Sequence, residues 1–97
     1  MSVKLVEVYG SGTGTVQREY SLRTVYINPD HVVCIREDGG AATLLREGRL
    51  PADLDSRQQF TRVTVNKGTY GQDIIIVGVV EEIFKKLQAQ KRQILRG

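Results

Sequence analysis

The side chains best suited to chemistry in this sequence are arginines that gather between residues 46 and 62. A guanidinium group matches phosphate oxygens through two parallel hydrogen bonds, and its flat face stacks on aromatic rings. Aromatic side chains can stack on a nucleobase, and an asparagine amide can hydrogen-bond a base edge or a ribose. The candidate ligand-binding residues that make up this nucleotide-pocket inventory are Arg46, Arg49, Arg57, Phe60, Arg62, Asn66, Lys67 and Tyr70.

The same residues also fit a solvated polar loop followed by a turn. Three of the arginines lie in a segment that holds four acidic residues, namely Asp38, Glu47, Asp53 and Asp55. Because these acids more than balance the three arginines, the inventory alone favours a solvated loop over a pocket. Both interpretations remain open at this point.

Residues for catalysis are scarce. The sequence has one histidine, His31, and one cysteine, Cys34. Side chains three positions apart in a strand point to opposite faces, so these two do not form a nucleophile–base pair. One histidine and one cysteine also fall short of the three or four ligands of a zinc site. We therefore expect a non-enzymatic protein with no catalytic residue, no metal and no cofactor.

A glycine-rich segment, Gly10-Ser11-Gly12-Thr13-Gly14, follows the first alternating stretch of the chain. The dinucleotide-binding fingerprint requires a helix directly after its glycines. Here Thr15 and Val16 lead into another extended segment, so the glycines predict a hairpin turn rather than a phosphate-binding loop.

The composition is that of a folded globular domain, with 40% hydrophobic and 26% charged residues. No apolar stretch approaches the roughly 20 residues of a membrane span, and the opening residues lack a signal-peptide pattern. The net charge of +3 permits a nucleic-acid partner without requiring one. With a single cysteine, we expect a cytoplasmic protein without a membrane partner, or one in the host cytoplasm if it is viral.

Alternating and β-branched segments predict a mainly β fold with a C-terminal α-helix, an α+β arrangement. We expect one domain over 1–97, with a small antiparallel sheet of about five or six strands capped by one amphipathic helix. The clearest strand segments are 3–9, 22–27, 32–36, 60–65 and 74–77, and a ragged one covers 15–20. An irregular excursion separates two of them at 38–59, where 41–46 fits either a strand or a helical turn.

The last segment, 79–95, has the apolar spacing of an amphipathic helix. Its stripe consists of Val80, Ile83, Phe84, Leu87, Ile94 and Leu95. Such a helix is about 25 Å long, whereas typical strands span roughly 17–20 Å. We therefore expect Ile94 and Leu95 to overhang the sheet and to support self-association as a dimer or larger oligomer. The basic residues of this segment match the helix dipole, which favours a solvated face over a nucleic-acid patch.

Two stretches carry family resemblances. Val25-Tyr26-Ile27-Asn28-Pro29-Asp30, together with Ile75-Ile76-Val77-Gly78-Val79-Val80-Glu81-Glu82-Ile83, resembles the FlbD-type small proteins and implies a protein-interaction or regulatory module. The end of the chain, Glu81 to Lys91, resembles the carbon storage regulator family and implies a single-stranded RNA-binding regulator. In that family an arginine precedes the helix, where this chain has Val79 and Val80.

In size, β-then-helix plan and basic loop chemistry, the chain is similar to the phage anti-Thoeris (Tad-type) sponge proteins. This resemblance implies an oligomer that holds a nucleotide-derived immune signal, of the cyclic ADP-ribose or cyclic oligonucleotide type, without cleaving it. The expected partner is then an anionic small molecule, whose sequestration inhibits host anti-phage defence. No site residue is transferred from the family, and the eight candidates named above rest on their own chemistry.

Overall fold

The computed structural model of this protein describes residues 2–11, 19–67 and 70–96, and the side chains within them except those of residues 11, 67, 70 and 90–96. This part contains the strands β1 (Val3–Ser11), β2 (Glu19–Ile27), β3 (Val32–Glu37), β4 (Phe60–Lys67) and β5 (Tyr70–Val77). The helices are α1 (Gly39–Arg46) and α2 (Val80–Arg96), and a short 3₁₀ turn, η1 (Pro29–His31), joins β2 to β3. The predicted mainly β fold with a C-terminal helix is confirmed.

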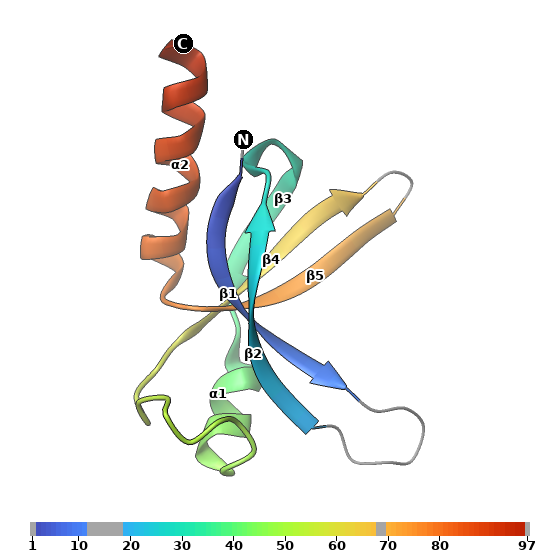
Figure 1. The fold of residues 1–97 in the computed structure, drawn as a ribbon, viewed down its shortest axis with the longest axis vertical. Helices are drawn as coiled ribbons and strands as arrows, with labels where there is room; N and C mark the ends of the chain where they lie inside the picture. The colour runs from blue at the N-terminus through green and yellow to red at the C-terminus, as the bar shows by residue number, and fades with distance from the viewer. Residues whose placement is uncertain (1, 12–18, 68–69, 97) are drawn as a thin grey trace.

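The five strands form one antiparallel sheet in the order β2-β1-β5-β4-β3. Its two hairpins, β1–β2 and β4–β5, are long, but β1 pairs with β5 only at Glu7–Ile76 and Val8–Ile75. Beyond these pairs the hairpins diverge, as the V formed by their arrows in Figure 1 shows. The sheet is therefore split into two arms that are joined near these pairs.

Helix α2 covers one face of the sheet. Its buried residues Ile83 and Leu87 pack in a cluster with side chains from β1, β4 and β5, among them Leu5, Val63 and Ile76. On the predicted apolar stripe, Phe84 remains 50% exposed. The side chains of Ile94 and Leu95, which we expected to overhang the sheet, lie outside the described part of the structure.

Helix α1 covers the other face and was not expected as a full helix. Ala41 packs with Val8, Leu50 and Phe60, and Ile75 of β5 lies against this second cluster. Because Ile75 and Ile76 are adjacent in a strand, they point to opposite faces, which places the two clusters on the two sides of the sheet. The 38–59 excursion thus contributes core as well as loop.

Both ends of α1 are fixed by specific caps. The side chain of Asp38 accepts a hydrogen bond from the backbone N–H of Ala41 at 2.9 Å, as an N-cap residue does. At the other end, Gly48 adopts a left-handed φ of 72°, and the N–H groups of Gly48 and Arg49 bond to the carbonyls of Leu45 and Leu44. This is the Schellman pattern of helix termination, in which glycine is favoured.

Gly78 makes the turn from β5 into α2 possible. Its φ is 138°, and a Cβ at this position would lie 3.0 Å from Cδ1 of Ile83. Its N–H donates to the carbonyl of Gln59, and its own carbonyl accepts from the hydroxyl of Thr61. A side chain at residue 78 would therefore be strained by this φ and would require the buried side chain of Ile83 to shift.

Candidate functional site

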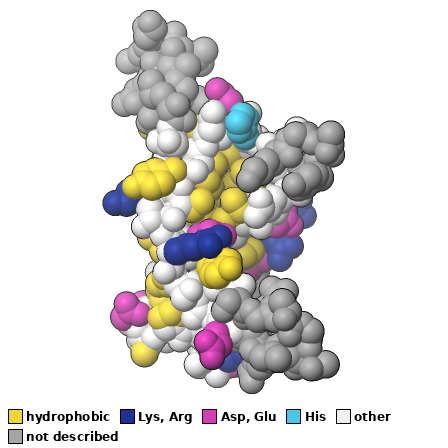
Figure 2. Space-filling model, turned by 45° about the vertical axis from the view of Figure 1, so that its right-hand side comes forward, with side chains coloured by type: hydrophobic (Ala, Val, Ile, Leu, Met, Phe, Trp, Pro, Cys, Tyr) yellow, Lys and Arg dark blue, Asp and Glu magenta, His cyan; other side chains and the backbone are white. Residues whose placement is uncertain are grey.

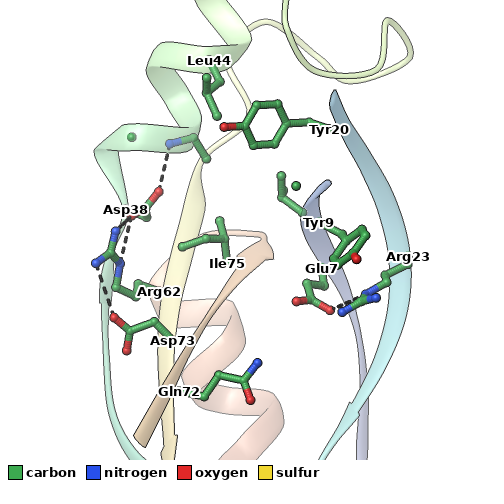
Figure 3. A pocket seen from close by; sticks show the side chains of 14 residues that line it. Glu7, Tyr9, Tyr20, Arg23, Asp38, Leu44, Arg62, Gln72, Asp73 and Ile75 are labelled. Atoms are coloured by element: carbon green, nitrogen blue, oxygen red, sulfur yellow. Dashed lines mark hydrogen bonds and ion pairs between the residues drawn. The ribbon is translucent and has the colours of Figure 1, made fainter. Parts of the chain in front are cut away.

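A cleft with a volume of about 580 Å³ lies in the angle between the two hairpins. Val8 and Ile75, a pair in the register where β1 still meets β5, contribute apolar surface to it. Tyr20 of β2 and Leu44 of α1 approach each other at one end, as Figure 3 shows. The cleft therefore has an apolar floor and one partly aromatic end, between two walls that carry charge.

The β4–β5 wall is organised by Arg62. Its Nη2 and Nε donate to Oδ1 of Asp38 at 2.8 and 3.1 Å, and its Nη1 lies 3.5 Å from Oδ2 of Asp73. Asp73 in turn accepts a 2.7 Å hydrogen bond from the hydroxyl of Thr64. Since Asp38 also caps α1, this one guanidinium joins the helix to both strands of the hairpin.

The β1–β2 wall carries a second arginine–carboxylate pair, seen opposite the first in Figure 3. The Nε of Arg23 donates to Oε1 of Glu7 at 2.9 Å, and the guanidinium lies 3.7 Å from the centre of the Tyr9 ring. The hydrogen bond to Glu7 raises the pKa of Arg23, so that this arginine remains charged. Glu7 itself is only 8% exposed, although it lies in a strand that continues to diverge from β5.

A second hollow of about 390 Å³ adjoins the cleft and shares Glu7, Arg23 and Gln72 with it. Apolar residues from three strands contribute to this hollow, namely Val25 and Ile27 of β2, Val65 of β4 and Ile74 of β5. Figure 2 shows the corresponding face, where basic and acidic side chains meet at the centre beside hydrophobic surface. A ligand in the cleft could therefore extend past the Arg23–Glu7 pair towards apolar surface.

The structure brings some of the predicted site residues to this region. Arg62 lines the cleft, and Asn66 lines the adjoining hollow. Arg49 lies 5.4 Å from the centre of the Tyr20 ring, which itself lines the cleft. Arg62 and Asn66 therefore line parts of one connected concave region, whereas Arg49 is next to it through its contact with Tyr20.

The other predicted site residues lie elsewhere. Phe60 is 1% exposed within the α1 cluster, so its ring is core and does not face a ligand here. Arg46 bonds to the hydroxyl of Thr43 on the surface of α1, and Arg57 has a 90% exposed side chain beside Asp55. The side chains of Lys67 and Tyr70 lie outside the described part of the chain, so their predicted role stays a prediction.

The residues that build most of the cleft were not among the candidates: Glu7, Tyr9, Tyr20, Arg23, Asp38, Gln72 and Asp73. Two of them had a recognisable signal in the sequence. Glu7 alternates in phase with Val3 and Leu5, and a carboxylate on the buried side of a strand requires a paired partner. Asp38 precedes a short apolar run, which is the position of an N-cap.

A third concave surface lies between β3 and α2 and is mainly apolar. This apolar groove, of about 220 Å³, is lined by Pro29, Val32, Val33, Cys34, Ile35, Phe84, Leu87 and Gln88. Val33 is 64% exposed and Phe84 50% exposed. His31 borders the hollow beside the cleft while Cys34 borders this groove, so the two residues face different surfaces.

None of the His, Cys, Asp and Glu side chains of the described residues forms a group of three or more placed to hold a metal ion. Among those residues there is also no helix with the length and apolar character needed to cross a membrane.

Comparisons of the sequence with protein-family models and with curated proteins, and of the fold with solved structures, gave no match.

Proposed function

We propose that this protein binds a nucleotide-derived small molecule in the cleft between its hairpins and holds it without chemical change. The observation that carries the proposal is the pairing of two arginine–carboxylate walls, Arg23–Glu7 and Arg62–Asp38–Asp73, across an apolar floor. Concave sites with an apolar lining and a few well-placed polar groups are the usual form of ligand pockets.

The side chains of the cleft suit the three chemical parts of a nucleotide. A base can stack on the Tyr9–Arg23 pair, where the ring and the guanidinium already lie 3.7 Å apart. Ribose hydroxyls can donate to carboxylates such as that of Asp73 and bond to the amide of Gln72. A phosphate can bind Arg49, whose only ion pair in the described structure is a long one of 3.9 Å to Glu47.

Under this proposal the protein acts as a sponge that lowers the concentration of a cyclic ADP-ribose-type or cyclic oligonucleotide signal. Removing the signal inhibits the host anti-phage defence that depends on it. Sequestration requires only affinity and a protein concentration above that of the signal, so it needs no catalytic group. Self-association of the chain as a dimer or larger oligomer is part of the same proposal.

Isothermal titration calorimetry against a panel of cyclic dinucleotides, cyclic trinucleotides and ADP-ribose isomers tests the proposal. We expect saturable binding of at least one member, which a double variant Arg23→Ala and Tyr9→Ala abolishes while Arg57→Ala retains it. Mass spectrometry of the ligand released by denaturing the complex should return the intact molecule. The absence of binding at tens of micromolar, about 6 to 7 kcal/mol of affinity, would refute the proposal.

The apolar groove supports a second candidate function, a FlbD-like protein-interaction module. Val33 of β3 and Phe84 of α2 are both at least half exposed and line the same groove. Contiguous exposed apolar surface marks sites of protein contact more often than sites for polar ligands. Light scattering as a function of concentration tests the simplest such contact, between copies of this chain, and Phe84→Ser should weaken it.

A further inference from the structure

We infer that the cleft admits the donor-bearing ring of its ligand and leaves the phosphates outside, at Arg49. This inference rests on the proposed function and deepens it, because it specifies which end of a nucleotide the cleft selects. Three observations carry it: Arg23 and Arg62 are already paired with carboxylates, the cleft has more carboxylates than cations, and Arg49 lies beside the Tyr20 end of the cleft.

Both arginines that line the cleft already have anionic partners. Each of the three guanidinium nitrogens of Arg62 lies within 3.5 Å of a carboxylate oxygen of Asp38 or Asp73. Arg23 is bonded to Glu7 and stacked on Tyr9. A phosphate entering the cleft would have to displace a carboxylate that is itself buried, such as Asp38 with 6% exposure. The resulting unpaired carboxylate makes this exchange unfavourable.

The described side chains that line the cleft include three carboxylates but only two cations. Each ionised carboxyl group offers about four acceptor positions. Oε1 of Glu7 accepts from Arg23, whereas within the described residues no side chain is bonded to Oε2. Glu7 is 8% exposed as a residue and 11% exposed in its side chain, and it borders both the cleft and the adjoining hollow. Such a group favours a ligand that donates hydrogen bonds and repels one that is negatively charged.

A flat ring that carries a hydrogen-bond donor fits the wall formed by Glu7, Tyr9 and Arg23. The guanidinium carbon of Arg23 lies over the ring of Tyr9, 3.7 Å from its centre, beside Glu7, so a heterocycle stacked on this pair brings its edge to the carboxylate. The exocyclic amino group of an adenine or a cytosine would then donate to Oε2 of Glu7. A charge-assisted bond of this kind discriminates strongly, because an analogue without the amino group would cover Oε2 and leave this acceptor without a partner.

The cation that we assign to the phosphates is Arg49, beside the Tyr20 end of the cleft. Arg49 lies 5.4 Å from the centre of that ring, with a side chain that is 31% exposed. Its nearest carboxylate in the described structure, on Glu47, is 3.9 Å away, beyond hydrogen-bonding distance. The guanidinium of Arg49 can therefore accept a phosphate without breaking a short ion pair, unlike that of Arg62 or Arg23.

Calorimetry with matched probes tests this assignment. Adenosine should bind at least about tenfold more tightly than purine riboside, which lacks only the amino group. Purine riboside cannot donate the hydrogen bond to the charged acceptor. Adenosine monophosphate should bind only about two- to fivefold more tightly than adenosine, as an exposed ion pair contributes little. Arg49→Ala should remove this phosphate gain, and the matched variant Arg57→Ala should keep it.

The Glu7→Ala variant tests whether the amino group of adenosine binds at Glu7. The preference for adenosine over purine riboside should fall below about threefold in this variant and stay intact in Asp55→Ala, since the amino group is assigned to Glu7 and Asp55 does not line the cleft. Circular dichroism establishes that each variant is folded, and Glu7→Gln, which weakens the acceptor and preserves the volume, replaces Glu7→Ala if that variant unfolds.

The outcomes separate this inference from the proposed function. Binding of nucleotides together with a hundredfold loss on removal of the phosphate would overturn the inference and leave the proposed function standing. Equal affinity for adenosine and purine riboside would also overturn it. If neither these probes nor any cyclic nucleotide of the panel binds, the proposed function itself fails.

Discussion

The cleft and the apolar groove are both concave, but they are built from opposite chemistry. The cleft has a charged pair on each wall, and its best-connected residue, Asp38, holds Arg62 and caps α1 at once. The groove is bordered by exposed apolar side chains such as Val33 and Phe84. One surface therefore has hydrogen bonds that fix its shape, whereas the other depends on packing between β3 and α2.

This difference determines what each surface can distinguish. A cleft with fixed donors and acceptors can reject a molecule that lacks one hydrogen bond, because the group left behind is unpaired. An apolar groove discriminates mainly by shape and by the apolar area that it buries. This difference is the reason why we propose small polar ligands for the cleft and contacts between protein surfaces for the groove.

Substituting Asp38 should produce the largest change in the stability of the cleft. Asp38→Ala removes the N-cap of α1, worth about 1 kcal/mol, and charge-assisted bonds to a half-exposed arginine, worth about 1 kcal/mol more. We expect a loss of about 2 kcal/mol in the free energy of unfolding and a melting temperature lower by roughly 10 °C. Thermal unfolding followed by circular dichroism measures both.

Two related variants sharpen this test. Asp38→Asn retains a good N-cap and loses only the ion pair, so it should cost about half as much as Asp38→Ala. Asp53→Ala, at an exposed position of the same segment, should change stability by less than about 0.5 kcal/mol. Equal stability of Asp38→Ala and Asp53→Ala would show that Asp38 does not organise the cleft in solution.

The sheet and the terminal helix were predictable because they follow simple periodicities. The alternation in β4 and the apolar spacing at Ile83 and Leu87 correspond directly to the buried faces of these elements. Helix α1 was harder to predict, since Gly39 and Gly40 in its first turn have low helix propensity and resemble a turn. Its N-cap, Asp38, and its C-terminal glycine, Gly48, were nonetheless both present in the sequence.

The cleft was less predictable than the fold because its residues come from distant segments. Glu7 and Arg23 meet through the register of β1 with β2, and Asp38 and Arg62 are 24 positions apart. Grouping residues by nearness in sequence favoured 46–70, which placed Phe60 in the candidate site although it is core. Long-range pairing, rather than residue type, decides which side chains share the cleft.

A substitution in the groove should change self-association more than stability, whereas a substitution of Asp38 in the cleft changes mainly stability. Phe84→Ser at a half-exposed position should change the free energy of unfolding by less than about 1 kcal/mol, far below the effect of truncating a core residue. It should nevertheless lower the light-scattering mass of any oligomer formed through the groove, with Lys85→Ser as the control on the neighbouring exposed position. An unchanged oligomer in Phe84→Ser would place self-association on another surface.

The smallest expected effect concerns the thiol of Cys34, which borders the groove. Hydrogen bonds from Arg36, at 3.4 Å, and from Thr64 lower the pKa of Cys34, so more thiolate is present at neutral pH than in an ordinary cysteine. Arg36→Ala should raise this pKa, move the pH profile of iodoacetamide alkylation to higher pH and slow the reaction at pH 7.

At about two units above the ordinary cysteine pKa of 8.5, wild type and Arg36→Ala should react at similar rates, because both thiols are then ionised. A slower reaction of Arg36→Ala at every pH would instead indicate a change in access to the groove. Ligand binding in the cleft should be unaffected by Arg36→Ala, since neither Arg36 nor Cys34 lines it. A joint loss of alkylation and binding would show that the two surfaces are coupled through β4, where Arg62 lines the cleft and Thr64 bonds to both Asp73 and Cys34.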